Sequence, residues 1–228
     1  MNKTLSNKKS IAVFVLPAFL IYVIFALFPI AYNIYLSFFD TDLMSHMTFV
    51  GLGNYKDLFN DGTFNHALSN NILLVIGSLI AHMPLAMFFG NAIFKHIKGA
   101  TFFQTVFFMP SVICGVAVGL TWTFIYNGNY GLLNACLKII GLGNLQEVWL
   151  SNKDIALFCI MVVIMWQYVG YHMIIQLAAM RNIDPNFYEA AELDSTPKWR
   201  VFFKITLPMI SPTILFTSVV ASIASFKI

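Results

Sequence analysis

The stretch DPNFYEAAELDSTPKWRVFFKITLP, residues 184–208, is a polar interruption between two hydrophobic blocks, and the rest of the chain is organised around it. Asp184 followed by Pro185 predicts a helix start. The carboxylate can accept the free amide protons of the first turn, and proline at the first helical position forfeits no hydrogen bond. Asp194-Ser195-Thr196-Pro197 ends this helix after about two turns. A second short helix follows, which we expect Leu207-Pro208 to break.

The two short helices present different surfaces. Ala190 and Ala191 give the first a small-residue surface that a partner backbone could approach closely, and three polar side chains remain available for contacts: Tyr188, Glu189 and Glu192. The second interleaves basic with aromatic side chains, a pattern suited to a lipid headgroup boundary: Lys198, Arg200 and Lys204 with Trp199, Phe202 and Phe203. An ordinary amphipathic loop between two membrane spans fits the same residues.

Glu189-Ala190-Ala191, then Ser195, then nine residues to Ile205-Thr206-Leu207-Pro208, resembles the EAA loop of permease subunits of binding-protein-dependent ABC importers. The residues around it, from Tyr188 to Asp194 with Trp199, resemble the carbohydrate-uptake branch, of the maltose and glycerol-phosphate type. The resemblance implies that loop 181–207 is a coupling helix that docks into a cytoplasmic ATPase subunit. Its coupling residues would be Tyr188, Glu189, Ala190, Ala191, Asp194 and Ser195.

Ser195 departs from the family pattern, which usually has glycine at this corner. If the corner requires a positive φ, serine there costs up to about 1 kcal/mol of backbone strain. A folded protein can tolerate that cost, so serine at position 195 is compatible with membership of the family.

The composition is that of an integral membrane protein. Hydrophobic residues make up 59% of the chain and charged residues 10%, with a mean hydropathy of +0.77. These values lie well outside the range of soluble domains. The three cysteines, Cys114, Cys136 and Cys159, show no metal-ligand spacing, so we expect no disulfide and no metal cluster.

Five hydrophobic blocks predict an all-α polytopic bundle that forms one permease domain over residues 11–228. Each block is long enough to cross the roughly 30 Å hydrocarbon core as a helix. The blocks occupy about residues 11–39, 72–94, 102–126, 155–180 and 208–228. The fifth block stops at Phe226-Lys227-Ile228 without a polar tail, and members of the resembling family normally have a sixth span. We therefore expect this chain to lack its C-terminal span.

The segments between the blocks alternate in charge. Nine lysines and arginines lie in residues 1–10, 95–98 and 181–204, whereas the other segments between the blocks hold six acidic side chains and only three lysines, Lys56, Lys138 and Lys153. The positive-inside rule then places the N-terminus, residues 1–10, and the loop 181–207 in the cytoplasm. We expect a multi-pass protein of the bacterial plasma membrane, embedded in the lipid bilayer.

One predicted span offers both hydrogen-bonding groups and aromatic faces, which a sugar site within a bilayer requires. The candidates for the substrate path are Trp166, Gln167, Tyr171, His172 and Gln176. Hydrogen bonds between helices and interfacial aromatic belts account for such residues as well, and for any single residue that is the commoner role.

Three classes of protein compete. The leading one is the membrane subunit of an ATP-driven importer for a sugar or sugar-like small-molecule solute. The resemblance implies a second permease subunit, a cytoplasmic ATPase dimer and an extracytoplasmic solute-binding protein as partners, and no nucleic acid. No phosphate-binding loop of the G-x-x-x-x-G-K-[ST] form occurs, so we expect no catalytic residue, cofactor or metal in this chain and ATP hydrolysis in a separate subunit.

The alternative is a secondary transporter or a channel. Such proteins usually keep charged residues inside the membrane and often show inverted repeats, whereas neither Asp, Glu, Lys nor Arg lies deep within the first four blocks. A membrane-embedded enzyme is the third class, and it requires a convergent set of reactive groups. His82 and His172 lie on separate blocks and have no carboxylate companions.

Overall fold

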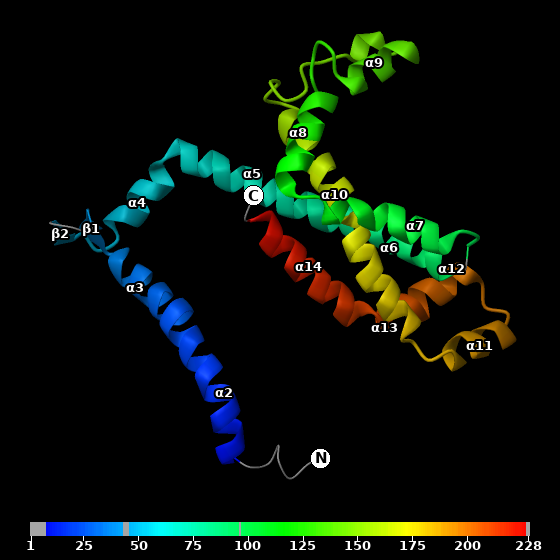
Figure 1. The fold of residues 1–228 in the computed structure, drawn as a ribbon, viewed down its shortest axis with the longest axis horizontal. Helices are drawn as coiled ribbons and strands as arrows, with labels where there is room; N and C mark the ends of the chain where they lie inside the picture. Colours follow the sequence, from blue (N-terminus) through cyan, green and yellow to red (C-terminus); the bar gives the residue numbers. More distant parts are fainter. Residues whose placement is uncertain (1–7, 43–45, 96, 227–228) are drawn as a thin grey trace. The chain divides into compact units, whose positions relative to one another are not determined.

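A computed structural model describes residues 8–42, 46–95 and 97–226 of the chain. The fold is almost entirely helical, as expected (Figure 1). Where the sequence predicted one domain over residues 11–228, the chain divides into two compact units, Met1–Ala67 and Leu68–Ile228. Residues 1–7 of the expected cytoplasmic N-terminus and the last two residues of the expected fifth span lie outside the described residues.

The first unit is a long apolar helix followed by a hairpin and a short helix. The elements are α2 (Lys8–Tyr22), the π-helical turn η1 (Val23–Leu27), α3 (Phe28–Leu36), β1 (Phe39–Thr41), β2 (Met47–Phe49) and α4 (Gly53–Asn60). The strands pair antiparallel, with Phe39 opposite Phe49. The Asn54 side chain donates to the carbonyl oxygens of Ser37 and Phe39, which ties α4 to the hairpin. The two strands have three residues each, so the fold remains all-α as predicted.

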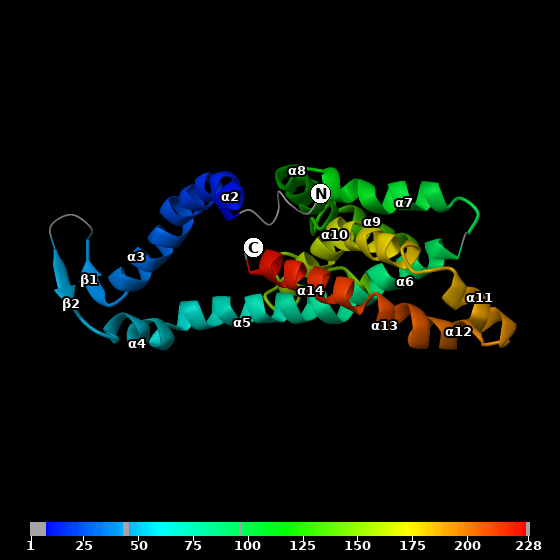
Figure 2. The ribbon, with the colours of Figure 1, turned by 90° about the horizontal axis from the view of Figure 1, so that it is seen from below.

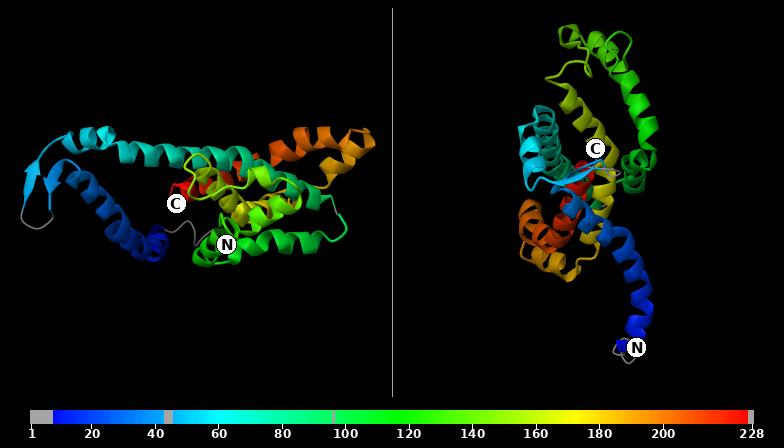
Figure 3. Two further views of the ribbon diagram at one scale, coloured as in Figure 1. Left: turned by 90° about the horizontal axis from the view of Figure 1, so that it is seen from above. Right: turned by 90° about the vertical axis from the view of Figure 1, so that its left-hand side faces the viewer.

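The second unit is built around α10 (Ala156–Arg181), which packs against α6 (Met83–Phe94), α7 (Ala100–Phe108) and α14 (Ser211–Ser225) (Figure 2). The remaining elements are α5 (Gly62–Gly77), which joins the two units, η2 (Ser78–His82), η3 (Met109–Val112), α8 (Gly115–Ile125), α9 (Leu132–Ile139), η4 (Gly143–Leu145), α11 (Asn186–Leu193), α12 (Lys198–Val201), η5 (Phe202–Thr206) and α13 (Leu207–Met209). The segment with α9 and the segment with α11 lie at opposite ends of α10 (Figure 3).

Three helices in the described part of the chain are long and apolar enough to cross a membrane: Ala12–Leu36, Gly62–Phe94 and Ala156–Arg181. Two bent helix pairs raise the number to five if each pair is one span. The second helix starts at Gly62, well before the expected block at residue 72.

The block at residues 102–126 is not the single helix that the sequence predicted. It consists of Ala100–Val112 and Gly115–Ile125, which are bent by 100° relative to each other. Pro110 has no amide proton to continue the α-helical hydrogen bonds, so the chain tightens into the 3₁₀ turn η3. Cys114 is then extended, at φ −63° and ψ 143°, and α8 begins afresh at Gly115.

Three prolines inside apolar helices are accommodated by π-helical turns. Pro29, Pro84 and Pro208 each lie two residues after the end of a five-residue π turn, respectively η1, η2 and η5. A proline ring clashes with the carbonyl of the residue four positions earlier, and each of those carbonyls lies inside the widened turn. The second loop helix was expected to break at Leu207-Pro208, and it ends one residue later, at Met209. That helix runs from Lys198 to Met209 and bends by 68° before α14.

The core of the second unit lies where α10 meets α6. One buried cluster consists of Ala86, Ile93, Val169, Met173 and Leu177, and a second of Met87, Met180, Ile183 and Ile210. Gly170 lets α10 approach α7 so closely that a Cβ there would meet the carbonyl oxygen of Phe107. Small residues at helix crossings are how membrane helices gain close packing without a hydrophobic driving force between them.

Candidate functional site

The helix α11 begins as the sequence predicted. The Oδ1 atom of Asp184 accepts a hydrogen bond from the amide of Asn186 at 3.0 Å. Pro185 already has helical angles, φ −54° and ψ −29°, so it occupies the first helical position with Asp184 as the cap.

The helix α11 ends in a Schellman motif with Ser195 in the left-handed conformation. The Thr196 amide donates to the carbonyl of Ala191 and the Ser195 amide to that of Glu192, both at 2.9 Å, which is the hydrogen-bond pair that defines the motif. Ser195 has a φ of +50° and is the only non-glycine residue with a positive φ in the described part of the chain. The corner therefore requires the conformation that glycine adopts most easily.

The two alanines of α11 face opposite ways. Ala191 is buried against the rest of this chain, whereas Ala190 is exposed. Tyr188 lies on the buried side, where its hydroxyl is 3.1 Å from the Thr206 hydroxyl and its ring packs on Phe94. The exposed side carries two large apolar side chains, Phe187 at 50% and Leu193 at 88% exposure, on either side of Ala190. Only Ala190 is thus free to meet a partner, which corrects the expectation that both alanines form that surface.

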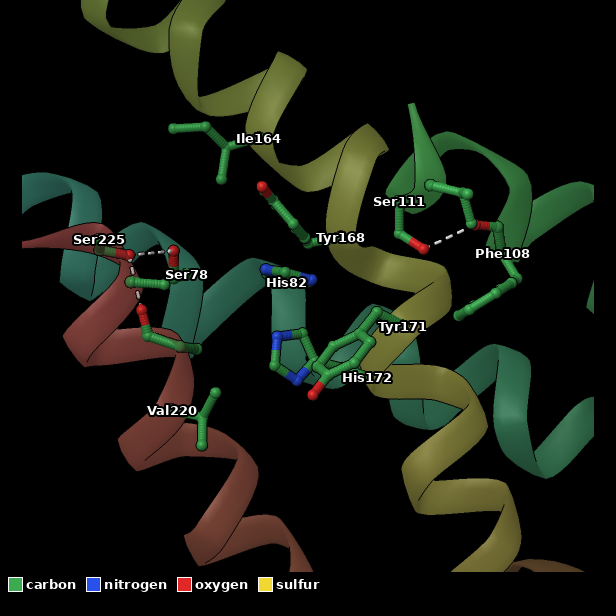
Figure 4. A pocket seen from close by; sticks show the side chains of 13 residues that line it. Ser78, His82, Phe108, Ser111, Ile164, Tyr168, Tyr171, His172, Val220 and Ser225 are labelled. Atoms are coloured by element: carbon green, nitrogen blue, oxygen red, sulfur yellow. Dashed lines mark hydrogen bonds between the residues drawn. The ribbon is translucent and has the colours of Figure 1, made fainter. Parts of the chain in front are cut away.

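A second candidate site is a cavity of about 410 Å³ inside the second unit (Figure 4). Five elements supply its wall: η2, the end of α7, η3, α10 and α14. From α10 come Ile164, Tyr168, Tyr171 and His172, which recur every three to four residues and so share one face of that helix. Ser111 and Val112 of η3 line the space just before the 100° bend between Ala100–Val112 and Gly115–Ile125.

The cavity contains buried polar groups but no formal charge among the described residues that line it. Ser78 and Ser225 are hydrogen-bonded through their hydroxyls at 3.1 Å. The rings of His82 and His172 are edge to face, with centroids 4.9 Å apart. Both ring nitrogens of His82 and Nδ1 of His172 lack a hydrogen-bond partner in the described structure. Because unpaired buried polar atoms are costly, these groups are suited to a neutral ligand that donates and accepts hydrogen bonds.

The five candidate path residues divide into two groups. Tyr171 and His172 line the cavity, whereas Trp166, Gln167 and Gln176 do not. Trp166 packs edge to face on Trp122, and the side chain of Gln167 donates to the carbonyl oxygen of Ile113 at 3.3 Å. Gln176 is fully buried, and its nearest polar contact is the Met83 sulfur at 3.8 Å. These three residues pack helices together, which was the competing interpretation.

Five polar lining residues were not among the candidates for the substrate path: Ser78, His82, Ser111, Tyr168 and Ser225. Tyr168 was within reach of sequence reasoning, because it shares the helix face of Tyr171 and His172. The serines carry no such signal, because single serines are common in membrane helices. Among the described residues, no group of three or more His, Cys, Asp or Glu side chains is placed to hold a metal ion.

Comparisons with known proteins place the chain in a family. Residues 9–228 match the family described as "Binding-protein-dependent transport system inner membrane component". The chain is 38% identical over 210 residues to the probable ABC transporter permease protein YurN of Bacillus subtilis (strain 168), a match that covers 89% of this chain and 70% of that protein. It is 32% identical over 216 residues to the lactose transport system permease protein LacF of Rhizobium radiobacter, covering 94% and 72%.

A solved structure has the same fold. It is that of a bacterial alginate ABC transporter in complex with an alginate pentasaccharide-bound periplasmic protein. The matched chain superposes with a TM-score of 0.79 at 24% identity, over 92% of this chain and 70% of that one. The family match over nearly the whole sequence, together with these relatives, shows that this chain belongs to the inner-membrane components, or permease subunits, of binding-protein-dependent ABC importers.

Proposed function

We propose that this permease subunit imports a neutral sugar or sugar-like solute, that its cavity forms part of the solute path, and that α11 couples it to a cytoplasmic ATPase. The working assembly would contain a second permease subunit, an ATPase dimer that hydrolyses ATP, and an extracytoplasmic solute-binding protein. The N-terminus and loop 181–207 would lie in the cytoplasm, in agreement with the charge alternation along the sequence.

The observation that carries the coupling proposal is the geometry of α11. An eight-residue helix stabilised at both ends, by Asp184 and by the Schellman motif at Ser195, keeps its exposed face in one orientation. That face presents Ala190 between Phe187 and Leu193, an arrangement with a shallow centre and apolar flanks. A rigid surface of this kind supports docking into a cleft of another protein, because little conformational entropy is lost on binding.

The coupling proposal is tested by tryptophan at three alanines. Ala190→Trp should overpack the docking contact at a cost of about 1–3 kcal/mol, so that ATPase co-purification and solute-stimulated hydrolysis fall while the thermal stability of the subunit is unchanged. Ala191→Trp should instead lower the stability of this subunit, because its side chain is buried within the chain. Ala135→Trp is the matched control, since Ala135 is exposed on α9, a helix of equal length in the other connecting segment.

Full coupling with Ala190→Trp would show that α11 does not dock through this face. Glu189→Ala adds a second measurement. If the exposed Glu189 carboxylate meets a donor in the partner, its removal should weaken docking by about 1–3 kcal/mol, because the donor is left unpaired.

The solute proposal rests on the chemistry of the cavity. Sugar hydroxyls both donate and accept hydrogen bonds, and the unpaired nitrogens of His82 and His172 with the hydroxyls of Ser78 and Ser225 offer both functions. Tyr168 and Tyr171 add aromatic surface that could cover the apolar face of a sugar ring. The relatives add support, since they include permease proteins named for lactose, alpha-glucoside and multiple-sugar transport.

Protection of introduced cysteines tests the solute path. In the assembled transporter, with Cys114, Cys136 and Cys159 replaced by serine or alanine, Ser78→Cys and Tyr171→Cys should react with a small thiol reagent and be protected by a transported sugar. Thr123→Cys, exposed on α8 outside the cavity, should react equally with and without sugar. If sugar protected neither cavity position while transport persisted, the cavity would not be on the path.

A further inference from the structure

One face of α6 borders two adjoining hollows, one apolar and one polar. Pro84, Phe88, Asn91 and Lys95 follow each other at helical spacing along this face. An apolar hollow of about 500 Å³ lies beside Pro84 and Phe88, and a polar one of about 310 Å³ lies beside Asn91 and Lys95. Phe202 of η5 lines both hollows, which lie between α6 and the segment from α11 to α14, and the two hollows together are called the groove below.

The polar end of the groove brings together two lysines from distant parts of the chain. Lys95 is the C-cap residue of α6, and Lys198 is the first residue of α12. The Thr196 hydroxyl and the Asn91 amide line the same space, as does the Glu192 carboxylate. This end can therefore bind a phosphate through two cations and two neutral donors, and it can also accept a cationic group.

The apolar end has the chemistry of a hydrocarbon site. Met83, Met87, Phe203 and Leu207 line it with Pro84 and Phe88, and Ser218 is the one polar residue among the described residues that border it. Methionine and phenylalanine side chains adapt to a flexible apolar ligand. Counting 1.5 Å of rise per residue, Phe88 and Pro84 lie about 10–16 Å below Lys95, which matches one leaflet, or half of the roughly 30 Å hydrocarbon core.

We propose that this groove binds one glycerophospholipid, with its phosphate between Lys95 and Lys198 and an acyl chain along α6 at Pro84–Phe88. Lys95 directly follows the last residue of a 33-residue apolar helix, so the polar end lies at the headgroup level. Glu192 would accept the ammonium of an ethanolamine headgroup, so that both headgroup charges find an opposite charge. The bound lipid would fill the space between α6 and the loop that carries α11. This proposal needs only that the chain is embedded in a membrane, and it is independent of the solute and of ATPase coupling.

Native mass spectrometry of the complex, purified with co-expressed partner subunits in mild detergent and titrated with phosphatidylethanolamine, tests the proposal. Lys95→Gln and Lys198→Gln should each weaken retention of one lipid by about 5-fold, because a lysine near a phospholipid contributes about 1 kcal/mol. Lys138→Gln on α9 removes the same charge outside the groove and should leave retention unchanged. Leu207→Trp should fill the apolar end and lower retention, whereas Val219→Trp, exposed on α14 outside the groove, should not.

Thermal midpoints of all five variants in detergent should agree with that of the parent protein. A lower lipid retention then cannot be attributed to unfolding of the variant. Retention that is unaffected by both groove lysines would overturn the proposal. An equal loss with Lys138→Gln would also overturn it, since general charge attraction would then suffice. If soluble glycerophosphoethanolamine displaced the lipid as effectively as intact lipid does, the site would recognise a headgroup alone, and the assignment of the apolar end would be wrong.

Discussion

Replacing Gly170 by alanine adds a single methyl group where α10 crosses α7, and we expect it to be among the most damaging small changes in this subunit. The added Cβ would meet the carbonyl group of Phe107 and lie 2.7 Å from the amide nitrogen of Phe108. These obstacles are backbone atoms, so no side-chain rotation relieves the contact and one helix must move. Overpacking costs about 1–3 kcal/mol, and the need to move backbone places this substitution near 3 kcal/mol.

The same displacement reaches the cavity. Phe108 lines it and η3 follows directly, so a shift of α7 changes the position of Ser111. We expect Gly170→Ala to lower both the free energy of unfolding in detergent, measured by denaturant titration, and sugar uptake by the assembled transporter.

Two other glycines provide a graded control series. A Cβ at Gly90 would lie 3.4 Å from the carbonyl oxygen of Met173, an ordinary contact, so Gly90→Ala should change stability by less than about 1 kcal/mol. A Cβ at Gly119 would meet nothing within 4 Å, so Gly119→Ala should be neutral or stabilising by up to about 1 kcal/mol. Equal stability for Gly170→Ala and Gly119→Ala would refute the argument that the α7–α10 crossing depends on the absence of a side chain.

Three further substitutions test local parts of the structure. Ser195→Gly should relieve about 1 kcal/mol of strain at φ +50° and lose about 0.4–1 kcal/mol to the freer unfolded chain, so a destabilisation above about 1 kcal/mol in thermal unfolding would contradict the strained corner. Gln167→Leu should leave the Ile113 carbonyl unpaired and destabilise by about 1 kcal/mol; unchanged unfolding would mean that this hydrogen bond contributes nothing. Asn134→Ala should remove the donors to the carbonyl oxygens of Gly128 and Glu147 and the acceptor for the Trp149 indole, each at 2.9 Å. The free energy of local unfolding of the segment around α9 should then fall by about 2–3 kcal/mol. Amide exchange in residues 128–149 measures that opening, and protection equal to the parent's would count against it.

The sequence alone predicted the membrane class, the helical fold and the first loop helix. Composition sets the class, and the cap at Asp184 involves residues only two positions apart. The reversal at Ser195 depends on six consecutive residues, from Ala191 to Thr196. Such features are local, so their stability depends almost entirely on the few consecutive residues that form them.

The sequence did not predict which prolines lie inside a continuous helix and which lie at a helix end. Pro29 and Pro84 lie within continuous apolar helices, each behind a π turn, whereas Pro110 follows the end of α7 and Pro208 lies one residue before the end of its helix. A proline inside an apolar segment can be accommodated by a widened π turn or by a helix break. The packing of neighbouring helices decides which of the two has the lower free energy. The 100° bend comes after Pro110, and the 68° bend comes after Met209, beyond the π turn η5.

What the sequence determined by itself was therefore which segments are apolar enough to enter a membrane, and how the short loop helix starts and ends. The tertiary structure decided which polar groups meet. Ser78 and Ser225 are 147 positions apart and form a hydrogen bond, and Tyr171 lines the cavity whereas Gln176, on the same helix, packs against α6. Helical spacing tells which residues share a face, but only the neighbouring helices determine whether that face meets a cavity or a packed core, because inside a membrane every apolar face is equally compatible with lipid.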